Sequence, residues 1–238
     1  MRRDNMSRAD DFLEKYKTLE EQLSEKFNYD EKSGSPVMRF ITDKEGKPFR
    51  EKLNMCREVR NFLSHHAEID GEPLVEPSEG MIRFLDEVND YVCRPPLAIS
   101  YSTLFADILK AGSKNKAITL MKKMQKQGFS HVPVIDNGVL TGVFSIGTFF
   151  SYALRHGMEA LKDDMLIEDF MELLPPDKHE SERFVFLPRT ATLFEAKNEF
   201  ENRAGRSKRL AVIFITDNGS ISGRILGMLT PWDVVNER

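Results

Sequence analysis

Several features that would assign a function directly are scarce or missing in this sequence. Only two cysteines are present, Cys56 and Cys93, and they share no metal-ligand spacing with each other or with the histidines. We interpret both as reduced structural thiols and expect no metal site. No apolar run approaches the roughly 20 residues that a membrane-spanning helix needs, and the charged N-terminus leads into no signal-peptide core. We therefore expect a cytoplasmic protein with no membrane partner.

An excess of positive charge is also missing. Lysine and arginine together number 34 against 38 aspartates and glutamates, which gives a formal net charge of −4. This balance argues against a broadly basic surface for nucleic acid, although it leaves room for a local basic patch. A chain of 238 residues that is 40% hydrophobic and 30% charged is typical of a globular protein with one or two domains.

Residues 1–94 predict a small α-helical domain. Three segments carry apolar residues at the three- and four-residue intervals of amphipathic helices: 10–27, 49–65 and 78–91. Turn residues surround a short apolar piece at 37–41, which we interpret as a loop that holds a brief strand or turn. Pro95 and Pro96 end the third helix and begin a linker at 95–103.

A pattern in the C-terminal part of the chain occurs twice. Each copy begins with a short strand, at 108–110 or 185–187, and continues with a helical segment, at 116–127 or 192–202. A strand, an Asn-Gly hairpin turn, a second strand and a helix follow. The second strands run into corresponding corners: Gly142-Val143-Phe144-Ser145-Ile146-Gly147-Thr148 and Gly227-Met228-Leu229-Thr230-Pro231-Trp232-Asp233. Two β-α-β-β-α units therefore stand in tandem.

This duplication resembles a pair of CBS domains, the cystathionine β-synthase repeat that is often called a Bateman module. The resemblance rests on the run His131-Val132-Pro133-Val134-Ile135-Asp136-Asn137-Gly138, on the paired Asn-Gly turns and on the closing corner. It implies an α+β fold in which the helical domain precedes two repeats that pack about a pseudo-twofold axis. The expected boundaries are 104–162 for the first repeat, 163–182 for a linker and 183–238 for the second repeat.

The corner at Thr230 and Asp233 has the chemistry to bind a ribose. A carboxylate can accept hydrogen bonds from both hydroxyls of a cis-diol, and Thr230 with the helix N-terminus can face a phosphate or another polar group. The alternative is that these residues only cap the last helix. The CBS resemblance implies that Asp233 contacts the ribose and that Thr230 is its hydroxyl partner. In the first repeat Ser145 and Thr148 take these positions, and because threonine cannot replace a carboxylate as a double acceptor, we expect one competent site.

Phosphate binding would need cations that face the same cleft. The resemblance places His131 there, and Arg209 is its equivalent in the second repeat, with Lys208, Arg206 and Arg189 as alternates. The alternative for each is an ordinary solvated surface cation. The clefts of this family imply a regulatory ligand such as AMP, ADP, ATP, NAD or S-adenosylmethionine, and no cofactor is required.

One motif in the helical domain suggests a different chemistry. Asn61 and His65 are four residues apart on one face of the predicted helix, and the side chain of Arg60 can reach them. A histidine can take a proton from an RNA 2′-hydroxyl while an arginine stabilises charge on the attacked phosphate. The motif resembles the R-N-x-x-x-H signature of HEPN domains, helical modules that include metal-independent ribonucleases working as dimers. The alternative is a HEPN-like domain without catalysis that dimerises or binds an RNA or protein partner.

The two repeats offer no nucleophile, metal cluster or acid–base pair of their own. We expect His156 and His179 to be surface residues without a role, and 175–180 to be an exposed linker. We therefore predict a cytoplasmic regulatory sensor that is a homodimer through its CBS pair, in which an adenosine-type nucleotide controls how the helical domains are arranged. The alternative is a nucleotide-regulated, metal-independent endoribonuclease of the HEPN type.

Overall fold

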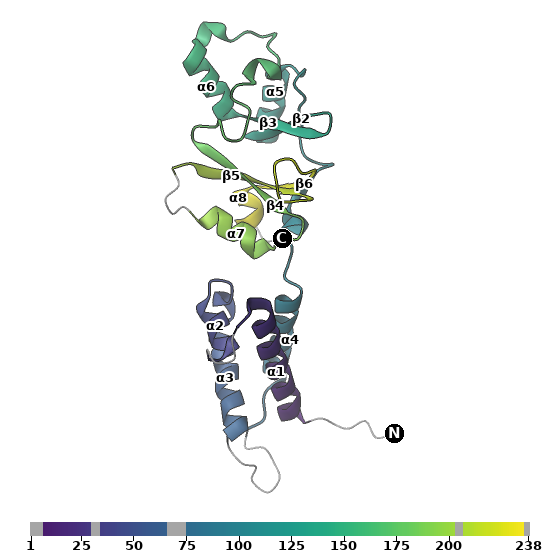
Figure 1. The fold of residues 1–238 in the computed structure, drawn as a ribbon, viewed down its shortest axis with the longest axis vertical. Helices are drawn as coiled ribbons and strands as arrows, with labels where there is room; N and C mark the ends of the chain where they lie inside the picture. Colours follow the sequence, from purple (N-terminus) through teal and green to yellow (C-terminus); the bar gives the residue numbers. More distant parts are fainter. Residues whose placement is uncertain (1–6, 30–33, 66–74, 203–206, 236–238) are drawn as a thin grey trace. The chain divides into compact units, whose positions relative to one another are not determined.

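A computed structural model describes residues 7–29, 34–65, 75–202 and 207–235, and the chain divides into two compact units, Met1–Pro95 and Pro96–Arg238 (Figure 1). The described part of the first unit is helical and the second unit contains both β-sheets, so the predicted α+β class is confirmed. Within the described residues, no helix has the length and apolar character that crossing a membrane requires.

The first unit is built from helices that begin where the sequence places capping residues. Its described elements are α1 (Arg8–Phe27), α2 (Pro36–Thr42), η2 (Lys47–Phe49), α3 (Arg50–His65) and α4 (Glu79–Cys93). The side chain of Ser7 accepts a hydrogen bond from the N–H of Asp10 at the start of α1, and Ser78 accepts one from Met81 at the start of α4. The three helices predicted from periodicity are confirmed.

The segment at 37–41 is not a loop with a brief strand or turn, because it lies inside α2. Pro36 stands at the first helical position, where its missing N–H has no cost. Val37, Phe40 and Ile41 then fall at the i, i+3 and i+4 positions of one buried face. The helix has only 7 residues, which is too short for its apolar period to be distinguished from alternation in the sequence.

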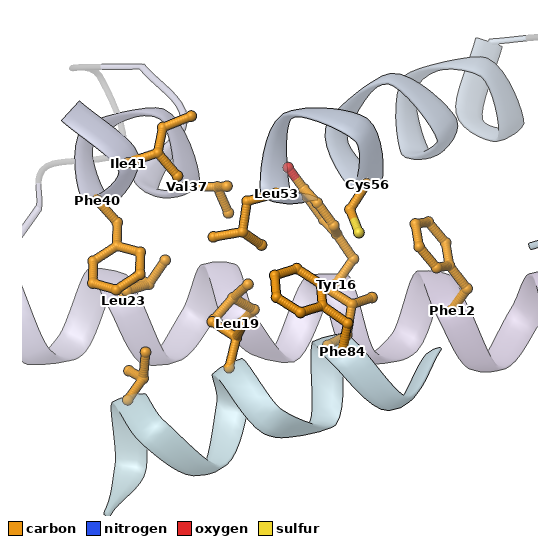
Figure 2. Packing of buried hydrophobic residues seen from close by; sticks show 13 residues of the cluster. Phe12, Tyr16, Leu19, Leu23, Val37, Phe40, Ile41, Leu53, Cys56 and Phe84 are labelled. Atoms are coloured by element: carbon orange, nitrogen blue, oxygen red, sulfur yellow. The ribbon is translucent and has the colours of Figure 1, made fainter. Parts of the chain in front are cut away.

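The core of the first unit lies between α1 and the helices around it (Figure 2). Leu19 and Leu23 of α1 belong to the same buried cluster as Leu53 of α3 and Phe84 of α4. Cys56 is buried in this cluster, and because burial disfavours a thiolate it raises the pKa of the thiol to about 11. This unreactive environment agrees with the interpretation of Cys56 as a structural thiol.

The second unit contains a four-stranded and a two-stranded sheet (Figure 1). Its elements in chain order are η3 (Ala98–Tyr101), β1 (Thr103–Leu104), α5 (Ala117–Gln127), β2 (His131–Asp136), β3 (Val139–Ser145), α6 (Ile146–His156), η4 (Met158–Ala160), η5 (Ile167–Phe170), β4 (Glu182–Pro188), α7 (Leu193–Glu201), β5 (Arg209–Thr216), β6 (Ile225–Leu229) and α8 (Pro231–Val235). β2 and β3 form the smaller sheet, and the larger one has the order β1-β6-β5-β4. β4 and β5 are parallel, and α7 is the crossover between them.

The two repeats share structure at two places. β1 precedes the first repeat, yet it pairs antiparallel with β6 of the second repeat, with Thr103 opposite Met228. β5 is buried on both faces: Val212 and Phe214 pack in one cluster with Val143 of β3, while Ile213 and Ile215 pack in another beneath α7 and α8. Alternate residues of one strand therefore hold the two repeats together on one face and the helices of the second repeat on the other. The pseudo-twofold relation of the repeats stays a prediction.

The opening strands of the two repeats differ. The strand predicted at 185–187 lies within β4 and is confirmed. The one predicted at 108–110 is wrong: those residues leave a turn, and parallel pairing is reduced to a single bridge between Ala111 and Val134. There the N–H of Ala111 donates to Pro133 O at 3.1 Å and the N–H of Ile135 donates to Ala111 O at 2.7 Å. Gly112 follows at once, and its N–H donates to the side chain of Asn115, so the chain turns before a strand can extend.

Two connections position the first repeat. Asn137 and Gly138 both have positive φ, at 53° and 80°, as a two-residue type I′ hairpin turn requires, so this predicted turn is confirmed. Farther along the chain, Met165, Ile167, Phe170 and Leu174 pack into the core around α5 and β2. Residues 165–174 are therefore part of the packed first repeat.

Candidate functional site

A cleft of about 430 Å³ opens in the second unit where both repeats contribute residues. The first repeat supplies residues 127–131, between α5 and β2, and the second supplies 209–211, 228 and 230–233. Residues 209–211 begin β5, and residues 228–233 end β6 and start α8. They lie close together because β5 and β6 are antiparallel, which puts the start of one strand beside the end of the other. The volume lies within the range of roughly 300–1,000 Å³ that small-molecule sites occupy.

Thr230 and Asp233 line this cleft as a single unit. The backbone N–H and the hydroxyl of Thr230 both donate to the Oδ2 atom of Asp233, each at 2.7 Å. This contact is the helix cap that the sequence left open as an alternative. Within the described residues, Oδ1 of Asp233 accepts no hydrogen bond from the protein, so one carboxylate oxygen stays available to a ligand. Capping therefore orients the carboxylate at the cleft.

His131 and Arg209 also line the cleft, and a third residue joins them behind its wall. This residue is Glu182, the first of β4, whose side chain is only 5% exposed. Its Oε1 atom lies 2.9 Å from a terminal nitrogen of Arg209 and 3.0 Å from Nε2 of His131. The contact with His131 does not meet the geometric requirements of a hydrogen bond, and it is an ion pair only when the ring is protonated.

The charge of Glu182 is stabilised by its surroundings. Burial alone would raise the pKa of its carboxyl, but the contacts with His131, His179 and Arg209 outweigh burial and hold the pKa well below its usual range. Sequence reasoning missed this residue. The available signal was an acid at the first position of the apolar strand Phe184-Val185-Phe186-Leu187, which has meaning only once the strand ends are known to meet.

The corner of the first repeat is closed. The side chains of Ser145 and Thr148 cap each other: the Ser145 N–H donates to the Thr148 hydroxyl, and the Thr148 N–H donates to Ser145 Oγ. Both residues are buried, and the Ser145 hydroxyl donates to Oε2 of Glu182 at 3.2 Å. The hollow beside Thr148 holds about 20 Å³, far below what a nucleoside needs. Glu182 therefore occupies the neighbourhood where a second ligand would have to enter.

The alternates for the cation lie elsewhere. Arg189 follows β4 at the end opposite Glu182, and because β4 and β5 are parallel it lies beyond Thr216, away from the start of β5 and from the cleft. The ammonium of Lys208 donates to the backbone oxygen of Asp177 at 3.4 Å and does not line the cleft. Arg206 lies outside the described residues. The structure thus brings His131, Arg209, Thr230 and Asp233 together and leaves Arg189 out.

Two further histidines were expected at the surface. His156 is there, with its Nε2 atom 2.9 Å from Oε1 of Glu172. His179 is not: it is buried, its Nδ1 atom lies 3.7 Å from Oε2 of Glu182, and its ring packs edge-on against Phe184 with centroids 4.8 Å apart. The expectation of an exposed linker at 175–180 is therefore wrong at His179, because this residue folds back to cover the carboxylate.

The R-N-x-x-x-H motif lies on α3 in the first unit, with His65 exposed at the end of the helix. The guanidinium of Arg60 donates to Oε2 of Glu20 at 3.2 Å and to Oδ1 of Asn61 at 3.2 Å. It also lies over the ring of Tyr16, 5.6 Å from the centroid. Its charge is thus balanced by a carboxylate from α1, an arrangement that suits a structural role as well as a catalytic one.

Removing the buried carboxylate should destabilise the second unit. We expect Glu182→Ala to lower its free energy of unfolding by about 3 kcal/mol, because the substitution leaves the His131 ring, the buried His179 ring and the buried Ser145 hydroxyl without the carboxylate that they contact. The folded-state pKa of Glu182 is depressed, so its contribution is complete above the ordinary glutamate pKa of about 4.3 and is lost as the pH falls below it. Denaturation followed by the fluorescence of Trp232, the only tryptophan, measures this difference at pH 7 and pH 4.

Glu168→Ala is the matched control. Glu168 forms an ion pair with the exposed Lys114, and such surface pairs contribute about 0–1 kcal/mol. Equal effects of the two substitutions at pH 7 would show that the buried carboxylate contributes no more to stability than a surface ion pair does.

Comparisons with known proteins show the family to which the chain belongs. No curated protein matches the chain. Solved structures with a similar fold include CBSX2 in complex with AMP (16% identity, 59% of this chain and 93% of that chain, TM-score 0.42), Hypoxic Response Protein I with two coordinated zinc ions (12%, 60% and 98%, 0.42) and MJ1225 from Methanocaldococcus jannaschii (16%, 70% and 55%, 0.44). The sequence model of the CBS domain matches residues 88–155 and 180–238. Since these two segments make up more than half of the 238 residues, the chain belongs to the CBS domain family.

Proposed function

We propose that this protein is a regulatory sensor that binds an adenosine-type nucleotide in the cleft of its CBS pair. The observation that carries the proposal is the corner of Thr230 and Asp233, where one carboxylate oxygen is held by the cap and the other remains available at the cleft. A ribose diol presents two adjacent hydroxyl donors, and this carboxylate is a suitable double acceptor. AMP, ADP, ATP, NAD and S-adenosylmethionine all carry that diol.

The other walls of the cleft suit the rest of such a ligand. Phe129, Leu210 and Met228 supply apolar and aromatic surface for a base, and His131 and Arg209 face the substituent on the sugar. Residues of both repeats are needed for this arrangement, so a bound ligand would stabilise the packing of one repeat against the other.

We further propose that the protein is a homodimer through its CBS pair. α6 carries large apolar side chains on one exposed face: Ile146, Phe150 and Leu154 are 65%, 61% and 70% exposed and are spaced four residues apart. A neighbouring apolar groove of about 530 Å³ runs between α5 and α6. Apolar surface of this kind marks an interaction site, and the homodimer that the CBS resemblance implies supplies its occupant. Ligand binding would then control how the two helical units of the dimer are arranged, in the cytoplasm.

A ribonuclease activity of the helical unit has less support. The chemistry needs an arginine whose charge is available to the attacked phosphate, whereas the Arg60 charge is balanced by Glu20. We therefore propose that Arg60, Asn61 and His65 belong to a HEPN-like unit that dimerises or binds a protein or RNA partner without cutting RNA.

Ligand binding should depend on the carboxylate of Asp233. At a hundredfold excess of ligand over its dissociation constant, bound nucleotide raises the free energy of unfolding by about 2.7 kcal/mol. We expect the Asp233→Asn protein to lose this stabilisation, because an amide oxygen can still cap α8 but the amide nitrogen that replaces Oδ1 cannot accept from a ribose hydroxyl. Thermal-shift titrations with AMP, ADP, ATP, NAD and S-adenosylmethionine measure it.

Asp217→Asn is the control for this experiment, since Asp217 accepts from the N–H of Arg224 in the loop between β5 and β6 and does not line the cleft. Undiminished binding by Asp233→Asn would show that Asp233 does not bind the ribose diol. If none of the five compounds stabilises the wild-type protein, the proposal that the cleft binds an adenosine-type nucleotide is wrong.

The apolar face of α6 should hold the dimer together. We expect Phe150→Glu and Leu154→Glu to shift the protein to half its assembled mass in light scattering, because a charged side chain in an apolar interface would lose its solvation without gaining a partner. Met171→Glu, an equally drastic change at another exposed apolar residue, should leave the mass unchanged. A wild-type protein that is a monomer at micromolar concentration would contradict this interface.

The helical unit should leave RNA intact. Incubation of the protein with single-stranded RNA in the presence of a chelator, with and without each nucleotide, should yield no fragments. Cutting that disappears in both Arg60→Ala and His65→Ala, with the helical content retained, would instead establish the ribonuclease.

A further inference from the structure

We infer that Glu182 makes the cleft selective for adenosine compounds whose 5′ substituent is uncharged or positive, and against those that carry a di- or triphosphate. The inference rests on the proposed function and narrows the chemical class of its ligand. It follows from the balance of charge around the cleft, to which Glu182 contributes from behind the wall.

The first observation is the scarcity of available cations. Among the described residues that line the cleft, Arg209 alone carries a permanent positive charge. Its guanidinium lies 2.9 Å from the carboxylate of Glu182, so the charge that would attract a phosphate is already balanced. Asp233 adds a negative charge on the same wall. A triphosphate usually needs several cations or a metal ion, and the described lining offers neither arrangement.

The second observation is that the negative charge of Glu182 is shielded from water. Its side chain is 5% exposed, in contrast to 74% for Arg209. Charges in such a position interact through a lower effective dielectric than exposed charges do, and salt screens them less. His131 is held by the same carboxylate, which leaves this imidazole less able to serve an incoming phosphate. The depressed pKa of Glu182 keeps it ionised at neutral pH.

The third observation is a second cavity on the other side of Asp233. It has a volume of about 760 Å³ and shares Thr103, Trp232 and Asp233 with the cleft. Its described lining contains Tyr101 and the carboxylate of Asp107, and it contains no basic residue. Carboxylates and aromatic faces attract a cation such as an ammonium or sulfonium group and repel a phosphate chain. A substituent on the ribose that extends into the second cavity would meet Asp107, and one that stays in the cleft would meet Arg209, whose charge Glu182 already balances.

Calorimetric titration of the full chain with ATP, adenosine and S-adenosylmethionine, without metal ions, tests the inference. We expect ATP to bind the wild-type protein about tenfold more weakly than adenosine, and S-adenosylmethionine to bind at least as tightly as adenosine. Glu182→Gln keeps the shape of the side chain and removes its charge, so it should raise the affinity for ATP relative to that for adenosine about tenfold, and this ratio cancels any general effect of the substitution on the cleft. Glu199→Gln, at an acid of α7 that does not line the cleft, should change neither affinity.

A second measurement needs no variant. If net negative charge repels the phosphates, rising salt should leave ATP binding to the wild-type protein unchanged or tighten it, whereas a site that attracts phosphates weakens with salt. ATP binding that is tighter than adenosine binding and weakens with salt, or an ATP affinity that does not rise relative to the adenosine affinity in Glu182→Gln, would overturn the inference while the proposed nucleotide site stands. If no adenosine compound binds, the proposed function fails and the inference with it.

Discussion

The buried carboxylate of Glu182 is the contact on which the arrangement of the second unit depends. It receives an arginine from the start of β5, a histidine from the start of β2, a hydroxyl from the end of β3 and the buried His179. These groups come from both repeats, and a single unpaired charge at this depth would be costly. The network is therefore satisfied only when the repeats are packed in one register. The same packing sets the spacing of the cleft walls.

The network also explains why two similar repeats have different capacities. In the second repeat the strand-to-helix corner ends in an acid that remains in contact with solvent-accessible space. In the first repeat the equivalent corner is a serine and a threonine that satisfy each other, and the serine hydroxyl donates to Glu182. Hydroxyls in this setting complete the hydrogen bonding of a buried acid, which a carboxylate at the position of Thr148 would oppose by like-charge repulsion. The same two residues, Ser145 and Thr148, therefore close the corner of the first repeat and contribute to the network around Glu182.

Much of the site was predictable because the duplication gives a register. Once Gly142 to Thr148 is aligned with Gly227 to Asp233, the ends of equivalent strands can be matched, and the residues that follow them must lie near one another. The chemistry of the corner and the CBS resemblance predicted Thr230 and Asp233, the resemblance placed His131 at the cleft, and the register of the repeats then gave Arg209; one cleft contains all four. The fold class and the three long helices of the first unit were predictable because their apolar period extends over several turns.

What the sequence did not predict depends on tertiary contacts. Glu182 and His179 have no local signal, since an acid and a histidine in polar segments usually remain in water. α2 is too short to show a period, and the strand at 108–110 is cut short by the turn at Gly112. Arg189 satisfied the chemical requirement for a cation near the second repeat, but the parallel pairing of β4 with β5 carries it to the far end of the sheet. Each wrong prediction concerns where the chain places a residue, and none concerns the chemistry that the residue type can perform.

The chain segment that follows the division between the two units takes part in the cleft. Thr103 of β1 lines the cleft and pairs with Met228, and β1 is the first strand after the units divide at Pro95 and Pro96. Under the proposed function, a ligand that tightens the cleft would act on the segment that follows the last helix of the first unit. The effect on the helical units can be no larger than the difference in ligand affinity between the two arrangements of that segment. β1 has only 2 residues and lies at the edge of its sheet, so few backbone hydrogen bonds hold it, and under the proposed function it is where we expect binding to alter the path of the chain.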